Sequence, residues 1–104
     1  MYDSIRNEWL VINTEGLYVV IKSDGKYIKS TDSEIVGCNI RRVQFENGNI
    51  YIPKDGKIYI INTKKNKSKN IKCYSVTKNS YITVRKNGFY IFNNDKCYEY
   101  VKLK

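Results

Sequence analysis

The chain has 104 residues, of which 41% are hydrophobic and 13% aromatic, which supports one domain with one core and excludes a disordered chain. It has no histidine, so it lacks the commonest general base and metal ligand, and we expect no enzyme activity. The net charge of +9 is uneven, with seven Lys or Arg against eight Asp or Glu in residues 1–56, and twelve against two in residues 57–104. A basic half favours a polyanionic partner, and the alternative is that lysine keeps a β protein soluble and protects its sheet edges.

The cysteines and the N-terminal residues bear on the compartment. Cys38, Cys73 and Cys97 are odd in number and have no C-x-x-C spacing, and residues 1–13 lack the features of a secretion signal. The longest apolar run, residues 17–21, is far shorter than the about 20 residues needed to cross a bilayer. We therefore expect a cytoplasmic protein without membrane association, whose cysteines are reduced, small buried hydrophobic residues rather than ligands of a metal or cofactor.

Turn signals divide the chain into about ten short predicted strands. Asn47-Gly48 and Asp55-Gly56 are the strongest hairpin signals. Residues 31–37 are predicted to be a loop in which Ser33 and Glu34 could begin a helical turn, and residues 63–70 are either a loop or a hairpin tip with basic arms. Because short turns join the strands, we expect one all-β domain over residues 1–104, an antiparallel meander. The predicted strands are residues 9–13, 17–22, 26–30, 40–46, 49–53, 57–62, 71–76, 81–85, 89–93 and 97–103.

One hairpin pattern occurs three times. A turn containing Gly16, Gly56 or Gly88 is followed by a strand with the pattern apolar-Tyr-apolar-apolar. Each of these strands is apolar on both faces, so we expect each to be covered on both sides, as in a sandwich or a stack of blades. The residues predicted to be buried are Val19, Tyr59, Ile60, Phe89 and Ile91.

The turn glycine followed by apolar-Tyr-apolar-apolar-Asn resembles the strand pairs in the blades of β-propellers of the quinoprotein or kelch type. The resemblance covers three pieces of the chain, which has no Trp-Asp signature. Three blades are fewer than the usual four to eight, so the resemblance implies a three-blade propeller-like assembly in which chains associate to complete a ring. The alternative, which the short chain length favours, is a monomeric sandwich or barrel.

The candidate binding residues are basic or aromatic and concentrate in the second half. Lysines in a dense tract neutralise phosphates, arginine can fork onto a phosphate or stack on a base, and tyrosine can stack on bases. The alternatives are a solvated lysine loop and cross-strand packing of the tyrosines. The candidates are the lysine tract (Lys64, Lys65, Lys67 and Lys69), the nearby Lys57 and Lys72, the arginine pair (Arg41 and Arg42), and Tyr74 and Tyr81.

These features lead to a functional hypothesis. We expect a small non-enzymatic intracellular binding protein whose basic face engages nucleic acid or a nucleoprotein complex. In size, charge and lack of motif the chain is similar in general character to phage-encoded inhibitors of host defence such as anti-CRISPR proteins, which implies an anti-defence role. The competing hypotheses are an oligomeric β protein that sequesters an anionic small molecule such as a nucleotide, and a structural subunit of a larger particle.

Overall fold

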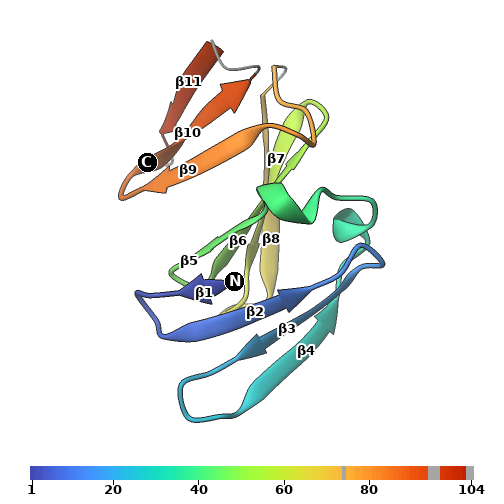
Figure 1. Ribbon diagram of the computed structural model, residues 1–104, viewed down its shortest axis with the longest axis vertical. Helices are drawn as coiled ribbons and strands as arrows, with labels where there is room; N and C mark the ends of the chain where they lie inside the picture. Colours follow the sequence, from blue (N-terminus) through green and yellow to red (C-terminus); the bar gives the residue numbers. More distant parts are fainter. Residues whose placement is uncertain (74, 94–96, 103–104) are drawn as a thin grey trace.

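The computed structural model describes residues 1–73, 75–93 and 97–102, and within them it places three antiparallel sheets (Figure 1). The N-terminal sheet holds β1 (Tyr2–Asp3), β2 (Glu8–Ile12), β3 (Leu17–Ile21) and β4 (Tyr27–Thr31). The central sheet holds β5 (Gln44–Glu46), β6 (Asn49–Lys54), β7 (Lys57–Asn62) and β8 (Lys67–Lys72). The C-terminal sheet holds β9 (Tyr81–Arg85), β10 (Gly88–Asn93) and β11 (Cys97–Lys102). Each sheet is a meander of consecutive strands, so the all-β antiparallel prediction is confirmed.

The three sheets lie one above another along the long dimension of the molecule, with the central sheet in the middle (Figure 1). Their first strands approach one another, because β1 and β9 each contact β5. Each sheet is open in the described residues and none closes on itself, so the closed barrel, one of the predicted alternatives, is not formed.

Two hydrophobic cores hold the stack together, one on each face of the central sheet, so the prediction of a single core is wrong. β7 contributes to both, because alternate side chains of a strand point to opposite faces. The core against the N-terminal sheet contains Leu10, Tyr18, Val20, Ile35, Cys38, Val43, Phe45, Ile50, Ile52, Tyr59 and Ile61. The core against the C-terminal sheet contains Tyr51, Ile58, Ile60, Cys73, Val76, Ile82, Phe89 and Ile91.

The prediction of burial on both faces is confirmed for the central sheet and wrong for the two outer ones. Tyr59 and Ile60 point to opposite faces of β7, and their exposed fractions are 9% and 5%. On β3, Val19 is only half-buried and Ile21 is 36% exposed, and on β10 Phe92 is 41% exposed. The physical reason is position, since an outer sheet of this stack has a neighbouring sheet on one face only.

Two predicted strands differ from the structure by more than one residue at an end. The predicted strand over residues 40–46 begins as a 3-10 turn, η2 (Ile40–Arg42), because the Asn39 side chain accepts a hydrogen bond from the backbone N of Arg41 at 3.1 Å. The strand predicted over residues 71–76 is instead β8, which begins at residue 67 and ends at residue 72 because it pairs over its whole length with β7. Residues 63–70 are therefore the hairpin tip with a basic arm. A second 3-10 turn, η1 (Ser33–Ile35), lies in the predicted loop.

Candidate anion-binding site

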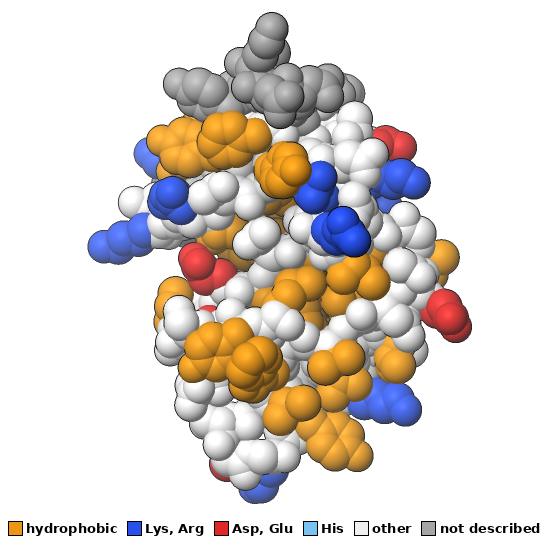
Figure 2. All heavy atoms as spheres, in the orientation of Figure 1, with side chains coloured by type: hydrophobic (Ala, Val, Ile, Leu, Met, Phe, Trp, Pro, Cys, Tyr) orange, Lys and Arg blue, Asp and Glu red, His pale blue; other side chains and the backbone are white. Residues whose placement is uncertain are grey.

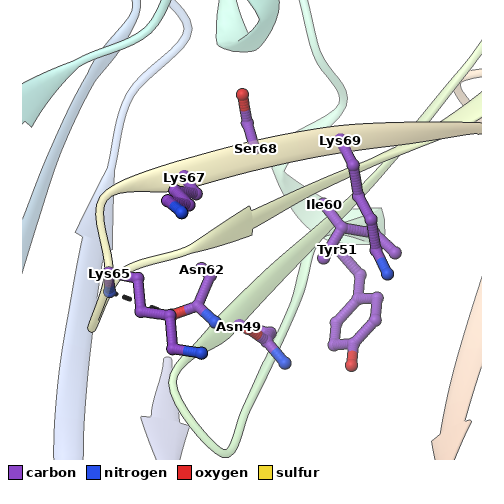
Figure 3. Close-up of a pocket in the computed structure, with 8 residues that line it drawn as sticks. All are labelled: Asn49, Tyr51, Ile60, Asn62, Lys65, Lys67, Ser68 and Lys69. Carbon is purple, nitrogen blue, oxygen red and sulfur yellow. Dashed lines mark hydrogen bonds between the residues drawn. The ribbon is translucent and has the colours of Figure 1, made fainter.

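A cavity of 360 Å³ lies on the central sheet, next to the turn between β7 and β8 (Figure 3). Its walls come from β6, β7, β8 and that turn. It brings together cationic, amide and aromatic side chains that are distant in sequence. The lining residues are Asn49, Tyr51, Ile60, Asn62, Lys65, Lys67, Ser68 and Lys69.

The strand register explains why these side chains meet. Directly opposite residues on neighbouring strands point to the same face, and so do residues two positions apart on one strand. Lys67 and Lys69 therefore share a face of β8, with Cα atoms about 6.8 Å apart along the strand. One cross-strand row consists of Asn49, Asn62 and Lys67, and the next consists of Tyr51, Ile60 and Lys69.

The β7–β8 turn brings a third lysine to the cavity. The Asn62 side-chain oxygen accepts hydrogen bonds from the backbone N of Lys64 at 3.0 Å and of Lys65 at 3.1 Å, the second of which is drawn in Figure 3. Asn66 then takes a positive φ of 52°, a conformation that asparagine tolerates in tight turns. The turn is thereby fixed with Lys65 among the residues that line the cavity.

The charge of the cavity is positive. No acidic residue lines it, and among the described residues the ion pairs lie elsewhere and involve neither Lys65, Lys67 nor Lys69. Burial raises the pKa of Tyr51, while a hydrogen bond with Asn49 acts in the opposite direction, so the phenol stays neutral and keeps its hydrogen for donation. The arrangement therefore offers three ammonium groups, two amides and one phenol to an anionic ligand.

The lysine tract is divided between two sides of the turn. Lys64 lines a separate hollow of 220 Å³ with Arg6 and Lys22, next to the N-terminal sheet. Its aliphatic stem covers Gly48, where an added Cβ would lie 3.1 Å from the Lys64 Cε. This separation could not be predicted from residue types, because it arises from the conformation of the turn.

The neighbouring lysines predicted to help do not line the cavity. Lys57 lies at the other end of β7, where its Nζ is 3.3 Å from an oxygen of Glu34. Lys72 is opposite Lys57 in the register, and alternation puts it on the face of Tyr59 and Ser68, whose hydroxyls are hydrogen-bonded at 2.8 Å. Both lysines are therefore apart from Lys65, Lys67 and Lys69.

The arginine pair also forms a separate basic site. Arg42 Nε donates a hydrogen bond to the backbone oxygen of Asn79 at 3.0 Å, and its guanidinium lies 3.8 Å from the centroid of the Tyr81 ring. Arg42 and Tyr81, two of the predicted binding residues, thus hold η2 against the start of β9 through a cation–π contact. Arg41 is exposed, and Tyr74 lies outside the described residues.

Sequence reasoning missed five lining residues: Asn49, Tyr51, Ile60, Asn62 and Ser68. They lie on β6, β7 and β8, and only the pairing of these strands puts them beside the lysines. Within the part of the chain that the structure describes, no group of three or more Cys, Asp or Glu could hold a metal ion, and no helix has the length and apolar character that crossing a membrane requires.

Comparison of the chain with protein-family models, with curated proteins and with solved structures finds no match. The resemblance to propeller blades and the similarity in character to anti-defence proteins therefore stay predictions. The candidate site rests on the residues and geometry of this chain alone.

Proposed function

We propose that the chain is a binding protein that holds nucleic acid through the cavity of Lys65, Lys67 and Lys69. The observation that carries the proposal is the convergence of three lysines, none of them in an ion pair among the described residues, on a cavity lined by no acidic residue. Such a cluster attracts phosphates and gains affinity by releasing their counterions.

The spacing of the lysines suits a linear polyanion. Lys67 and Lys69 are separated by about 6.8 Å along β8. A stacked nucleic-acid strand has one phosphate per about 3.4 Å of its axis, so a strand running along β8 would place every second phosphate at a lysine. The amides of Asn49 and Asn62 carry both donors and acceptors, and these can meet the polar edges of bases.

The size of the cavity supports a second candidate, an anionic small molecule such as a nucleotide. Its 360 Å³ falls at the lower end of the range for small-molecule sites, which is roughly 300–1,000 Å³. Lysine on β8 also has a plain structural use, because β8 is an edge strand of the central sheet and charge discourages edge-to-edge pairing. A binding experiment must therefore separate the three possibilities.

The test is the fluorescence anisotropy of a labelled single-stranded oligothymidylate, titrated with protein at several salt concentrations. The triple variant Lys65→Ser, Lys67→Ser and Lys69→Ser removes the cavity charges and leaves the strand polar. Its control removes the same charge from exposed turn positions outside the cavity, Lys26→Ser, Lys78→Ser and Lys86→Ser. If all three lysines contact phosphate, the salt slope of the triple variant falls by about 2, because each contact on a single strand contributes about 0.7.

The same titration distinguishes the cavity from a simple effect of net charge, and nucleic acid from a small-molecule ligand. Equal losses in the two triple variants would show that binding follows net charge and not the cavity. Full displacement of the oligonucleotide by an equal concentration of a mononucleotide would favour the small-molecule candidate. If the parent binds neither ligand, the lysines only protect the edge of the sheet.

A further inference from the structure

The outward face of the N-terminal sheet is apolar and exposed. One cross-strand row runs over all four strands, and its residues are opposite one another in the register: Tyr2, Trp9, Ile21 and Tyr27. Their exposed fractions are 45%, 53%, 36% and 68%. Val11, which is 58% exposed, and Val19 lie opposite each other in the next row. Figure 2 shows hydrophobic side chains gathered over this sheet, in the lower part of the view.

This exposed face is built like a face that is covered elsewhere in the same chain. Counted from the turn glycines Gly16 and Gly56, Val19 and Ile21 on β3 correspond to Tyr59 and Ile61 on β7. The register extends the match to the preceding strands, where Trp9 and Val11 correspond to Ile50 and Ile52. All four residues of the central sheet are buried against the N-terminal sheet. The N-terminal sheet thus offers the kind of face on which a preceding sheet packs.

The C-terminal sheet offers the complementary face at the other end of the stack. Its row of Thr83, Tyr90 and Tyr100 has the register of the central row of Gln44, Tyr51 and Ile60. In the central sheet, Tyr51 and Ile60 of that row are buried against the C-terminal sheet. In the C-terminal sheet the corresponding face is exposed at Tyr100, by 43%, and at Phe92, by 41%. Hydrophobic side chains are also visible over the C-terminal sheet, in the upper part of Figure 2.

We propose that two copies of this chain close into a ring, each packing its C-terminal sheet on the N-terminal sheet of the other. This interface repeats the two packings of sheet on sheet already present within the chain. The approach of β1, β5 and β9 gives the three sheets a common side, which would face the centre of the ring. A contact between two different faces leads either to a closed ring or to an open filament. Closed rings of four-stranded sheets usually have four to eight members. Two of the sheets in this chain have four strands and the C-terminal one has three in the described residues, and two copies would give a ring of six sheets, within that range.

The contact area is sufficient for a stable dimer. The N-terminal and the C-terminal sheet each have 17 strand residues, so each face covers about 270 Å², from the strand spacing and the rise per residue. A closed dimer has two such interfaces, so it would bury about 1,100 Å² counted over both copies, which just exceeds the roughly 1,000 Å² that a biological interface should clear. An open dimer with a single interface would bury half of that and dissociate readily.

The first measurement is the molar mass by size-exclusion chromatography with light scattering, over a range of protein concentrations. The proposal expects twice the chain mass of 12.3 kDa. A protein that remains at the mass of one chain at the highest concentration overturns the proposal, and so does a series of ever larger filaments.

Single charges on each face identify the interface. Val11→Glu alters the N-terminal face and Tyr100→Glu the C-terminal face, and both positions are exposed, so the fold of a single chain should persist. Circular dichroism and thermal unfolding check this, and Trp9→Glu replaces Val11→Glu should that variant unfold. We expect each variant alone to dissociate at a concentration at least about tenfold higher than the parent, because a buried unpaired charge opposes association.

Mixing the two variants distinguishes the proposed interface from pairing of like faces. An equimolar mixture retains one intact interface between an unaltered N-terminal face and an unaltered C-terminal face, so it should dimerise more weakly than the parent but at concentrations where each variant alone, which has no intact interface, is monomeric. If Tyr100→Glu leaves the dimer intact while Val11→Glu breaks it, two N-terminal faces pair with each other and the proposal is wrong. The triple lysine variant should remain dimeric, because its substitutions lie on the central sheet and not on either outer face.

Discussion

Asp3 connects the N-terminal sheet to the central sheet. Its side chain is only 1% exposed, and one carboxylate oxygen accepts a hydrogen bond from the backbone N of Gly48 at 2.7 Å. The other oxygen accepts from the backbone N of Ile5 at 3.1 Å and of Arg6 at 3.3 Å. A single carboxylate thus joins the turn after β1 to the turn between β5 and β6, next to the common side of the three sheets.

We predict that Asp3→Ala lowers the free energy of unfolding by about 3 kcal/mol. The substitution leaves the buried amide of Gly48 without its acceptor, at a cost of about 1–3 kcal/mol, and also removes the charge-assisted bonds within the first turn. Asp3→Asn should cost about 1–2 kcal/mol, because an amide has one oxygen and cannot accept on both sides as the carboxylate does. For a domain of this size, each kcal/mol corresponds to a fall in Tm of about 4–8 °C.

Urea denaturation of the parent and the two variants measures these differences. Asp24→Asn is the matched control, since that side chain accepts a hydrogen bond from the backbone N of Lys26 at 2.9 Å in an exposed turn. It should stay within about 0.5 kcal/mol of the parent. If Asp3→Asn is as stable as the parent, the carboxylate does not hold the two turns together and the reasoning is refuted.

Two further predictions concern the core and one ion-pair cluster. Ile60→Ala should lower the free energy of unfolding by about 2–5 kcal/mol, because a buried side chain is lost from the core, whereas Ile5→Ala, at a position 62% exposed, should have little effect in the same urea titration. The hydrogen bonds of two lysines, Lys54 foremost, lower the pKa of Glu34 below its usual 4.5, so Glu34 stabilises the fold above that pH and the contribution is lost as the pH falls through the folded pKa. Glu34→Gln should therefore be less stable than the parent at pH 7, by less than about 1 kcal/mol because the cluster is partly exposed, and the two curves of stability against pH should meet in acid. Parallel curves throughout would contradict this assignment.

Local turn chemistry made much of the secondary structure predictable. Asn47 and Gly48 have φ values of 51° and 77°, and Gly56 has 83°, the positive angles for which those residues were recognised. The bounds of β7 and β9 agree with the prediction, because each is a run rich in β-branched and aromatic residues between two turns. Gly88, a predicted turn glycine, is instead the first residue of β10. The two-residue β1 is too short to leave a pattern in the sequence.

Long-range packing decided what local patterns could not. The alternation of Val43 and Phe45 is real, but the Asn39 cap stops the strand from starting at residue 40. β3, β7 and β10 are all apolar on both faces, and only the order of the sheets determines which faces become buried. For the candidate site, the lysine tract was predictable from the sequence, but the division of its lysines between two hollows was not. The conformation of the turn places Lys64 in the hollow with Arg6, and Lys65 in the cavity with Asn62.

The two proposals together make one more prediction. In a closed dimer the lysine cavities lie on the two central sheets, away from both outer faces, so one assembly would present two binding sites. A strand long enough to reach both sites would bind the second at a high effective concentration, whereas a short strand would occupy one site. Val11→Glu, which breaks the dimer, should therefore weaken the binding of a long oligothymidylate in the anisotropy titration and leave that of a short one unchanged. Loss of Lys65, Lys67 and Lys69 should weaken both. If Val11→Glu leaves the preference for long strands intact, the cavities do not act as a pair, and each chain binds nucleic acid alone.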